Sequence, residues 1–365
     1  MERLPPDVIL EILSRLPITT LVQSKSVCRS WRSIIQGSVL ANKHLLYTAE
    51  NDPCIIFQSQ RPIPDQYYFV DFACYSEGNK SLKKISVSTM HARLVASSNG
   101  LLCLCSYSVI HICNPLTRDF VELPKLSREY GEMVILGFDF IPTKKEYKVV
   151  EIICRRKRFR FESHLAASNP FQSQVRILTV GDSQWRSLGM VPYQFVQGQS
   201  QVTVSGRLHW IAQPENIIMD NRIISFDLTA EQFQVVPQPD NVILDSRFFE
   251  LVVLRGHLCV AASNASCGLD IWVMKEYNVK ESWVKEFIIG GCLPQELPSM
   301  NGRIPFFRSD FRVVCSFRSG KILLERRRTS FLLYDPVHET FEDLVFEGEL
   351  NWHKMVVHVG SLVSI

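Results

Sequence analysis

Side chains that can bind zinc gather at one place in the chain, where Cys103, Cys105, His111 and Cys113 follow one another closely. If residues 106–108 turn a hairpin so that residue 103 faces residue 111, these side chains project from one face and suit tetrahedral zinc. The spacing matches no standard zinc motif, and a one-residue slip in register would place the two strands' sets on opposite faces. Since reduced cysteine is also common in buried strands, we expect neither a metal nor a cofactor here.

Two arginine-rich runs offer a different chemistry, that of a charged binding surface. They comprise Arg155, Arg156, Lys157, Arg158 and Arg160 in the first run and Arg326, Arg327 and Arg328 in the second. Each run follows an apolar segment typical of a strand, so each is expected at a strand end or a hairpin tip. One interpretation is a solvated loop rim, and a nuclear-import signal or an RNA contact is another. The third is a contact surface for an acidic protein substrate, with the candidate residues Arg155, Arg156, Arg158, Arg326 and Arg327.

No catalytic set is recognisable in the sequence. The segments Gly290-Gly291 and Ser319-Gly320-Lys321 lack the spacing of a phosphate-binding loop. Neither a GxSxG pattern nor an HExxH pattern occurs. We therefore expect a protein without an active site of its own.

The composition narrows the class of partner and the compartment. The 365-residue chain has a formal net charge of only +3, which is too small to make nucleic acid or an anionic membrane the expected partner. No stretch approaches the roughly 20 apolar residues of a membrane helix, and the residues after Met1 do not resemble a signal peptide. The eleven scattered cysteines are therefore expected to be free thiols in a reducing compartment, the cytoplasm or the nucleus or both.

The elements that must position these residues differ between the two parts of the chain. The first part, residues 1–46, is helical. Apolar side chains recur with helical period from Val8 to Leu16, Pro17 ends that helix and begins a second, and a third spans Val27 to Ile35. Three helices this short carry more large apolar side chains than they can bury among themselves. Either the following domain or the helices of a partner must cover them.

From residue 50 to residue 365 the pattern changes to short apolar runs separated by Gly, Asn, Asp and Pro, which is typical of an all-β domain. A polar residue followed by glycine opens a strand at Asn99-Gly100, Ser205-Gly206, Arg255-Gly256 and Ser319-Gly320. Four strands in roughly 50 residues are typical of kelch-like propeller blades. We predict a β-propeller of about six blades, with five or seven as alternatives and a large β-sandwich as the competing architecture. Residues 355–365 are expected to pair with early strands and close the ring.

The string LPPDVILEILSRLP, followed by LVQSKSVCRSWRSII, resembles an F-box, the motif by which many proteins bind the Skp-type adaptor of SCF ubiquitin ligases. The matching features are the two Leu-Pro pairs and the Val-Cys-Arg…Trp signature. The resemblance implies that cullin and RING subunits are reached through the adaptor. It also implies an adaptor contact made by ten residues, which are Leu4, Pro5, Val8, Ile12, Leu16, Pro17, Leu21, Val22, Cys28 and Trp31.

The later segments NGLLCL, ICNPLTRDFVELP and LGFDFIPTKKEYKVVEI resemble successive motifs of the plant F-box associated domain. Members of that family use this domain to capture proteins for ubiquitination. The resemblance implies a non-catalytic substrate-recognition subunit of a cullin–RING ubiquitin ligase, with an unknown protein substrate. Substrate contacts are expected in loops at residues 155–174, 194–201, 240–246 and 294–308. The alternatives are a protein-interaction module outside any ligase and a glycan-binding propeller.

Overall fold

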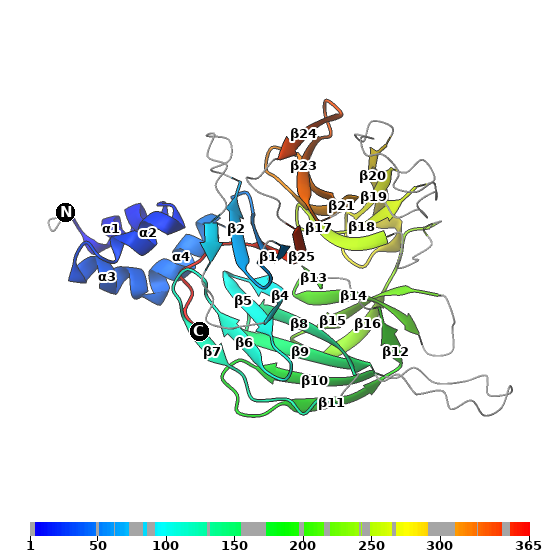
Figure 1. Cartoon of the computed structure of the whole chain (residues 1–365), viewed down its shortest axis with the longest axis horizontal. Helices are drawn as coiled ribbons and strands as arrows, with labels where there is room; N and C mark the ends of the chain where they lie inside the picture. The colour runs from blue at the N-terminus through cyan, green and yellow to red at the C-terminus, as the bar shows by residue number, and fades with distance from the viewer. Residues whose placement is uncertain are drawn as a thin grey trace. The chain divides into compact units, whose positions relative to one another are not determined.

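A computed structural model of the chain describes residues 4–48, 51–61, 63–72, 83–85, 92–129, 132–154, 173–196, 201–214, 220–240, 242, 249–264, 268–290, 311–326, 328–344 and 351–365. The chain divides into two compact units, one of Met1–Ser127 with Val345–Ile365 and one of Arg128–Leu344. The first unit contains the α-helices and two sheets, and the second contains four sheets (Figure 1).

Four α-helices open the chain: α1 (Pro6–Ser14), α2 (Ile18–Ser24), α3 (Arg29–Gln36) and α4 (Ser38–Thr48). Pro5 precedes α1 and Pro17 precedes α2, at a position where a missing N–H costs little because N–H groups of the first turn have no helical acceptor. The prediction of three helices was incomplete, since it missed α4. The apolar residues of α4 surround the helix instead of forming a stripe, so the sequence carries no helical period there.

The core of the helical segment includes a residue from the far end of the chain. Leu13, Leu21, Ile35 and Leu40 pack together with Leu362, and all five side chains are at most 5% exposed. The four helices therefore do not form a closed core by themselves. The C-terminal tail completes it.

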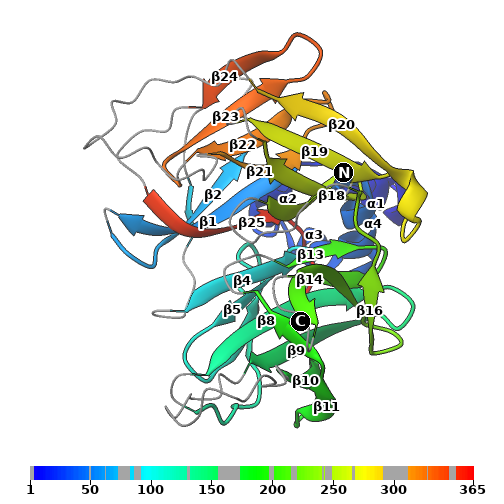
Figure 2. The same cartoon turned by 90° about the vertical axis from the view of Figure 1, so that its right-hand side faces the viewer.

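Two four-stranded antiparallel sheets complete the first unit. Their strand orders are β25 (Asn351–His358), β1 (Cys54–Arg61), β2 (Tyr67–Asp71), β3 (Lys83–Ile85) and β4 (Arg93–Ser98), β5 (Leu101–Cys105), β6 (Ile110–Cys113), β7 (Phe120–Glu122). The last strand, β25, pairs antiparallel with β1, and Cys54 lies opposite His358 (Figure 2). The prediction that the end of the chain pairs with an early strand is confirmed. The pairing segment is Asn351–His358, and the residues after it leave the sheet.

Four more antiparallel sheets form the second unit. The first contains β8 (Met133–Ile141), β9 (Glu146–Cys154), β10 (Ser173–Thr179) and β11 (Arg186–Val191), and the second contains β12 (Tyr193–Phe195), β13 (Val202–Val204), β14 (Arg207–Pro214), β15 (Arg222–Asp227) and β16 (Gln232–Val236). The third contains β17 (Phe249–Leu254), β18 (His257–Ser263), β19 (Leu269–Met274) and β20 (Trp283–Ile289). The fourth contains β21 (Phe311–Ser316), β22 (Ile322–Arg326), β23 (Ser330–Asp335) and β24 (Thr340–Leu344). With the two sheets of the first unit, these make the six blades of a β-propeller, as predicted.

The polar-glycine pairs mark hairpin turns. Asn99 has a φ of 47° and Gly100 a φ of 83°, and the same left-handed pair occurs at Ser205-Gly206 and Arg255-Gly256. A two-residue turn with positive φ at both positions matches the twist of the strands that it joins. At these three places the sequence marker is the turn of the β4–β5, β13–β14 and β17–β18 hairpins.

Antiparallel pairing fixes which turns share an end of each sheet in the second unit. The β17–β18, β19–β20 and β21–β22 turns lie at one end of their sheets, and the β22–β23 turn lies at the other. Arg326, the last residue of β22, is therefore at this second end. No helix in the described part of the chain is long and apolar enough to cross a membrane.

Candidate functional site

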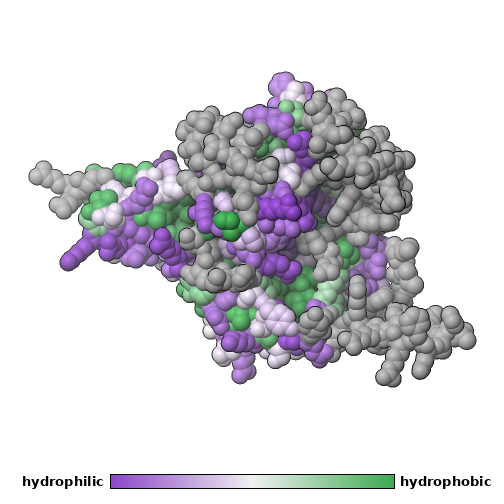
Figure 3. Space-filling model, viewed as in Figure 1, coloured by the Kyte–Doolittle hydropathy of each residue, from purple (hydrophilic) through white to green (hydrophobic). Residues whose placement is uncertain are grey.

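Apolar side chains remain uncovered on one side of α1. Val8 and Ile12, one helical turn apart, are 42% and 41% exposed, and Leu4 just before the helix is 39% exposed. Leu13 on the other side of α1 is fully buried. Figure 3 shows hydrophobic residues on the surface of this helical segment, with hydrophilic residues beside them. Large apolar side chains gathered in this way are typical of a docking surface.

An ion-pair network joins α1 to α4 beside the exposed apolar side chains of α1. Glu11 accepts hydrogen bonds from Arg15 at 2.8 Å, from the Tyr47 hydroxyl at 3.0 Å and from Lys43. The bonds from Lys43, then Arg15 and Tyr47, lower the pKa of Glu11 to about 2. Because Ile12 is the next residue along the helix, its side chain points about 100° away from this contact. With Leu13 packed in the helical core, Ile12 and Val8 stay on the exposed side of α1.

The ten predicted contact residues differ in exposure. Six are exposed (Leu4, Pro5, Val8, Ile12, Pro17 and Cys28), three are half-buried (Leu16, Val22 and Trp31), and one, Leu21, is buried. Leu21 packs in the helical core and is 0% exposed, so its contact with the adaptor stays a prediction that this conformation does not support. The sequence of a helix as short as α2 does not tell which of the neighbours Leu21 and Val22 faces inward.

Three strongly exposed apolar residues of the helical segment were not among the predicted contacts. Val27 is 64% exposed, and Val39 and Leu46 on α4 are 65% and 75% exposed. Val27 stands directly before Cys28, so its place in the sequence marks it as a candidate. Val39 and Leu46 could not be found without knowing that α4 exists.

The C-terminal tail holds the helical segment against the sheet of β4–β7. The Ser361 hydroxyl donates to the Asn99 carbonyl at 2.6 Å, in the β4–β5 turn. Gly360 lies against Leu116 and Ile18, and a Cβ atom there would approach both side chains to 3.2 Å or less. The helices and the sheet thus contact the same tail.

The cysteine–histidine group does not converge on one point. In the β5–β6 hairpin Cys103 lies opposite Ile112, and Leu104 lies opposite His111. This register differs by one residue from the arrangement that a zinc site needs, so the side chains of Cys103 and His111 point to opposite faces. Burial raises the pKa of the Cys113 thiol to about 12, which is typical of an unreactive thiol in a strand interior.

Of the five arginines predicted to contact a substrate, only Arg326 is among the described residues. Arg155, Arg156, Arg158 and Arg327 lie outside the described residues, as do most residues of the loops that were expected to bind substrate. The Arg326 side chain donates to the Ser330 hydroxyl at 3.1 Å and lies 4.0 Å from Asp343. Its role in substrate binding stays a prediction.

Both parts of the chain match known protein families. An F-box domain model matches residues 1–42, and a model of the F-box associated beta propeller domain matches residues 44–342. Of the Arabidopsis thaliana proteins, F-box protein At3g07870 is 36% identical over 99% of this chain and 92% of its own length. F-box protein CPR1 is 25% identical over 100% of this chain and 89% of its own length. F-box/kelch-repeat protein At3g23880 is 26% identical over 88% of this chain and 87% of its own length.

The helix α1, with Leu4 before it, lies within the F-box match, and the strands from β1 to β23 lie within the propeller match. The strand β25, which completes the first blade, follows the propeller match. The propeller model alone covers more than half of the chain. The chain therefore belongs to the family of plant F-box proteins that carry an F-box associated β-propeller domain.

Proposed function

We propose that this chain is the substrate-recognition subunit of an SCF-type cullin–RING ubiquitin ligase, without catalysis of its own. Its F-box binds a Skp-type adaptor, the adaptor connects it to the cullin and RING subunits, and the propeller binds a protein substrate. The observation that carries the proposal is the exposed apolar surface of Leu4, Val8 and Ile12 within the F-box match.

The chemistry of that surface fits the helices of a partner. An exposed Ile or Val contributes ~1.5–3 kcal/mol when it becomes fully buried, so covering three partly exposed apolar side chains is a substantial part of a binding free energy. Exposed Arg29 and Arg32 stand beside the predicted contact residue Cys28. Such charges would speed association with an acidic partner more than they would add affinity.

The propeller contributes by holding the substrate. A substrate bound to the blades and an adaptor bound to the helices are parts of one assembly, which raises the effective concentration of the substrate near the ubiquitin-conjugating enzyme. The C-terminal tail supports this role, because it contacts both the helical core and the β4–β5 turn. The tail thus joins the F-box helices to the β4–β7 sheet within the first unit.

The test is affinity capture of the tagged full chain from plant cells with the proteasome inhibited. The wild-type chain should bring down a Skp-type adaptor, a cullin, a RING protein and one or more ubiquitinated proteins. Ile12→Asp places a charge in the apolar surface and should remove the adaptor, the cullin and the RING protein while keeping the captured substrate.

A matched control is Val337→Asp, since Val337 is 81% exposed in the β23–β24 turn of the propeller. This variant should keep every partner. If the wild-type chain brings down no adaptor, or if Ile12→Asp retains it, the proposed function is wrong.

A further inference from the structure

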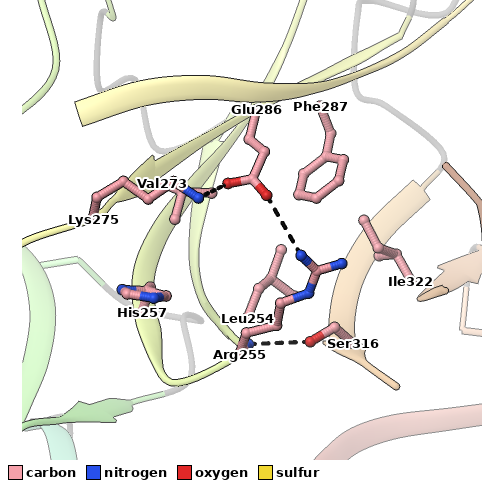
Figure 4. Close-up of a pocket in the computed structure, with 9 residues that line it drawn as sticks. All are labelled: Leu254, Arg255, His257, Val273, Lys275, Glu286, Phe287, Ser316 and Ile322. Carbon is pink, nitrogen blue, oxygen red and sulfur yellow. Dashed lines mark hydrogen bonds and ion pairs between the residues drawn. The ribbon is translucent and has the colours of Figure 1, made fainter. Parts of the chain in front are cut away.

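A pocket of about 170 Å³ lies within the second unit, at the strand ends formed by the β17–β18, β19–β20 and β21–β22 turns (Figure 4). Its polar lining consists of Arg255, His257, Lys275, Glu286 and Ser316. Four of these residues come from the β17–β20 blade, and the fifth ends β21. Two neighbouring blades thus build the pocket together.

Two cationic side chains of the pocket share one carboxylate. Arg255 lies 3.7 Å from one oxygen of Glu286, and Lys275 forms an ion pair with the other. Figure 4 shows both cations directed toward Glu286. A single carboxylate balances one of them, so the group carries one positive charge in excess. The electric field of this excess charge is stronger in a concave site than on a flat surface.

The position of Arg255 is fixed by its backbone. Arg255 stands in the left-handed turn with a φ of 50°, and its backbone N–H donates to the Ser316 hydroxyl at 3.1 Å. Its guanidinium lies 6.0 Å from the centre of the Phe287 ring. The side chain nevertheless stays 51% exposed, and that of Lys275 stays 47% exposed. Both cations can therefore be reached from outside.

The size of the pocket limits what it can hold. Sites for whole small molecules usually have about 300–1,000 Å³, so about 170 Å³ suits a single side chain of a larger molecule. Leu254, Val273 and Ile322 line the pocket beside the charged groups, and they can contact the methylene groups of such a side chain. The Ser316 hydroxyl can donate one hydrogen bond to its polar end.

We propose that this pocket binds one anionic side chain, a carboxylate or a phosphorylated residue, of the protein that the propeller recognises. The inference rests on the proposed function, and it names the chemistry of one substrate contact. A cationic side chain would meet two positive charges, and a neutral one would leave the excess charge uncompensated. An anion completes an arrangement of two cations and two anions with charge-assisted hydrogen bonds.

The pocket lies at the other end of β22 from Arg326, one of the residues that the sequence suggested for substrate binding. Ile322 lines the pocket at the start of β22, and Arg326 ends the same strand. Four residue steps along the extended strand separate these two by about 13 Å. The proposed contact is therefore at the opposite end of β22 from Arg326.

The test uses the full chain in complex with its adaptor and pools of random heptapeptides whose central residue is fixed as Glu, phosphoserine, Gln or Lys. We expect the Glu pool, the phosphoserine pool or both to bind roughly tenfold more tightly than the Gln pool, the effect of one charge-assisted hydrogen bond. The Lys pool should bind least. Comparison of the Glu and phosphoserine pools tells which anion is preferred.

Two variants should move that preference in opposite directions. Lys275→Gln removes one cation and should lower the preference for the anionic pools over the Gln pool severalfold. Glu286→Gln removes the carboxylate that competes with the peptide for both cations, and it should raise this preference. Lys285→Gln is the matched control: Lys285 lies on the same strand as Glu286 and pairs with Asp270 at 2.6 Å, outside the pocket lining. It should leave the preference unchanged. A merely structural ion pair would not give opposite shifts.

Equal binding of the Glu, phosphoserine and Gln pools would overturn the inference, and so would shifts of the same sign for Lys275→Gln and Glu286→Gln. Adaptor binding is measured for each variant in parallel. If the adaptor binds and no anion preference is found, the pocket inference fails alone. If no adaptor binds the wild-type chain, the proposed function fails, and the peptide pools then report on the isolated chain.

Discussion

The side-chain amide of Asn114 donates a hydrogen bond to the backbone carbonyl of Ser361 at 3.0 Å, across 247 positions of the sequence. The same nitrogen donates to the Val363 carbonyl at 2.8 Å, and its carbonyl oxygen accepts from the Leu116 N–H at 2.9 Å. Asn114 is fully buried. Between the two bonded carbonyls lies Leu362, which enters the helical core. One amide in the β6–β7 turn therefore holds the tail that completes the F-box.

Asn114→Ala should destabilise the first unit strongly. The substitution leaves the carbonyls of Ser361 and Val363 and the N–H of Leu116 without their hydrogen bonds to Asn114. Each buried group left unsatisfied costs about 1–3 kcal/mol. We expect the free energy of unfolding to fall by about 2–4 kcal/mol in urea denaturation. Asn42→Ala on the exposed side of α4 is the control and should change it little. A loss below 1 kcal/mol for Asn114→Ala would contradict the role of the tail.

Leu21→Ala and Ile12→Ala separate the core of the F-box from its surface. Leu21 is fully buried, so its truncation should lower the free energy of unfolding by about 2–5 kcal/mol. Ile12 is 41% exposed, so its truncation should lower stability less and weaken adaptor binding more. Denaturation and titration with adaptor measure the two effects. The reverse order would show that Leu21, and not Ile12, belongs to the contact.

Glu11→Gln should loosen α1 from α4 without changing the apolar surface itself. The pKa of Glu11 is lowered to about 2 by Lys43, Arg15 and Tyr47. A lowered folded-state pKa means that the carboxylate stabilises the fold above its ordinary pKa of 4.5, and that this contribution disappears as the pH falls through about 2. At pH 7 the variant should show faster amide exchange in α1 than the wild-type chain. Asp7→Asn, which removes an exposed carboxylate from the same helix, should not.

The stability of the first unit should depend on pH through His358. This histidine is buried, its Nδ1 lies 2.8 Å from the Ser97 hydroxyl, and burial lowers its pKa from 6.5 to about 3. The unfolded chain then binds a proton below pH 6.5 that the folded chain does not. Stability is therefore full above pH 6.5 and falls toward pH 3, by up to about 1.4 kcal/mol per pH unit.

Urea denaturation at pH 7.5 and pH 5 measures this dependence. His358→Gln should be less stable at pH 7.5 and should show a shallower dependence on pH than the wild-type chain. A slope equal to that of the wild-type chain would show that His358 is not the group responsible. His209, whose pKa burial lowers to about 4, adds a dependence of the same sign in the second unit.

Much of this molecule can be predicted from particular residues. Pro5, Pro17 and the apolar period from Val8 locate the first two helices, and the glycine pairs locate hairpin turns because L residues rarely adopt positive φ. The helix α4 was missed because it has no apolar stripe. The inward position of Leu21 depends on packing with Leu362, which lies more than three hundred residues away in the sequence.

The pocket shows the same limit. Arg255, Lys275, Glu286 and Ser316 stand in four different segments with no common motif. Only the alignment of two neighbouring blades brings them together. The arginine runs were conspicuous in sequence because their charges are consecutive, whereas a site assembled from single residues leaves no such signal.

The measurement that tests the central claim most directly is a titration of purified Skp-type adaptor into the purified chain, with Val8→Asp as the comparison. Val8 is 42% exposed and belongs to the apolar surface of Leu4, Val8 and Ile12. We predict a one-to-one complex for the wild-type chain and an affinity at least tenfold lower for the folded variant, because the charge would have to be buried in an apolar contact. No binding by the wild-type chain, or equal binding by both, would contradict the assignment of this chain as a ligase subunit.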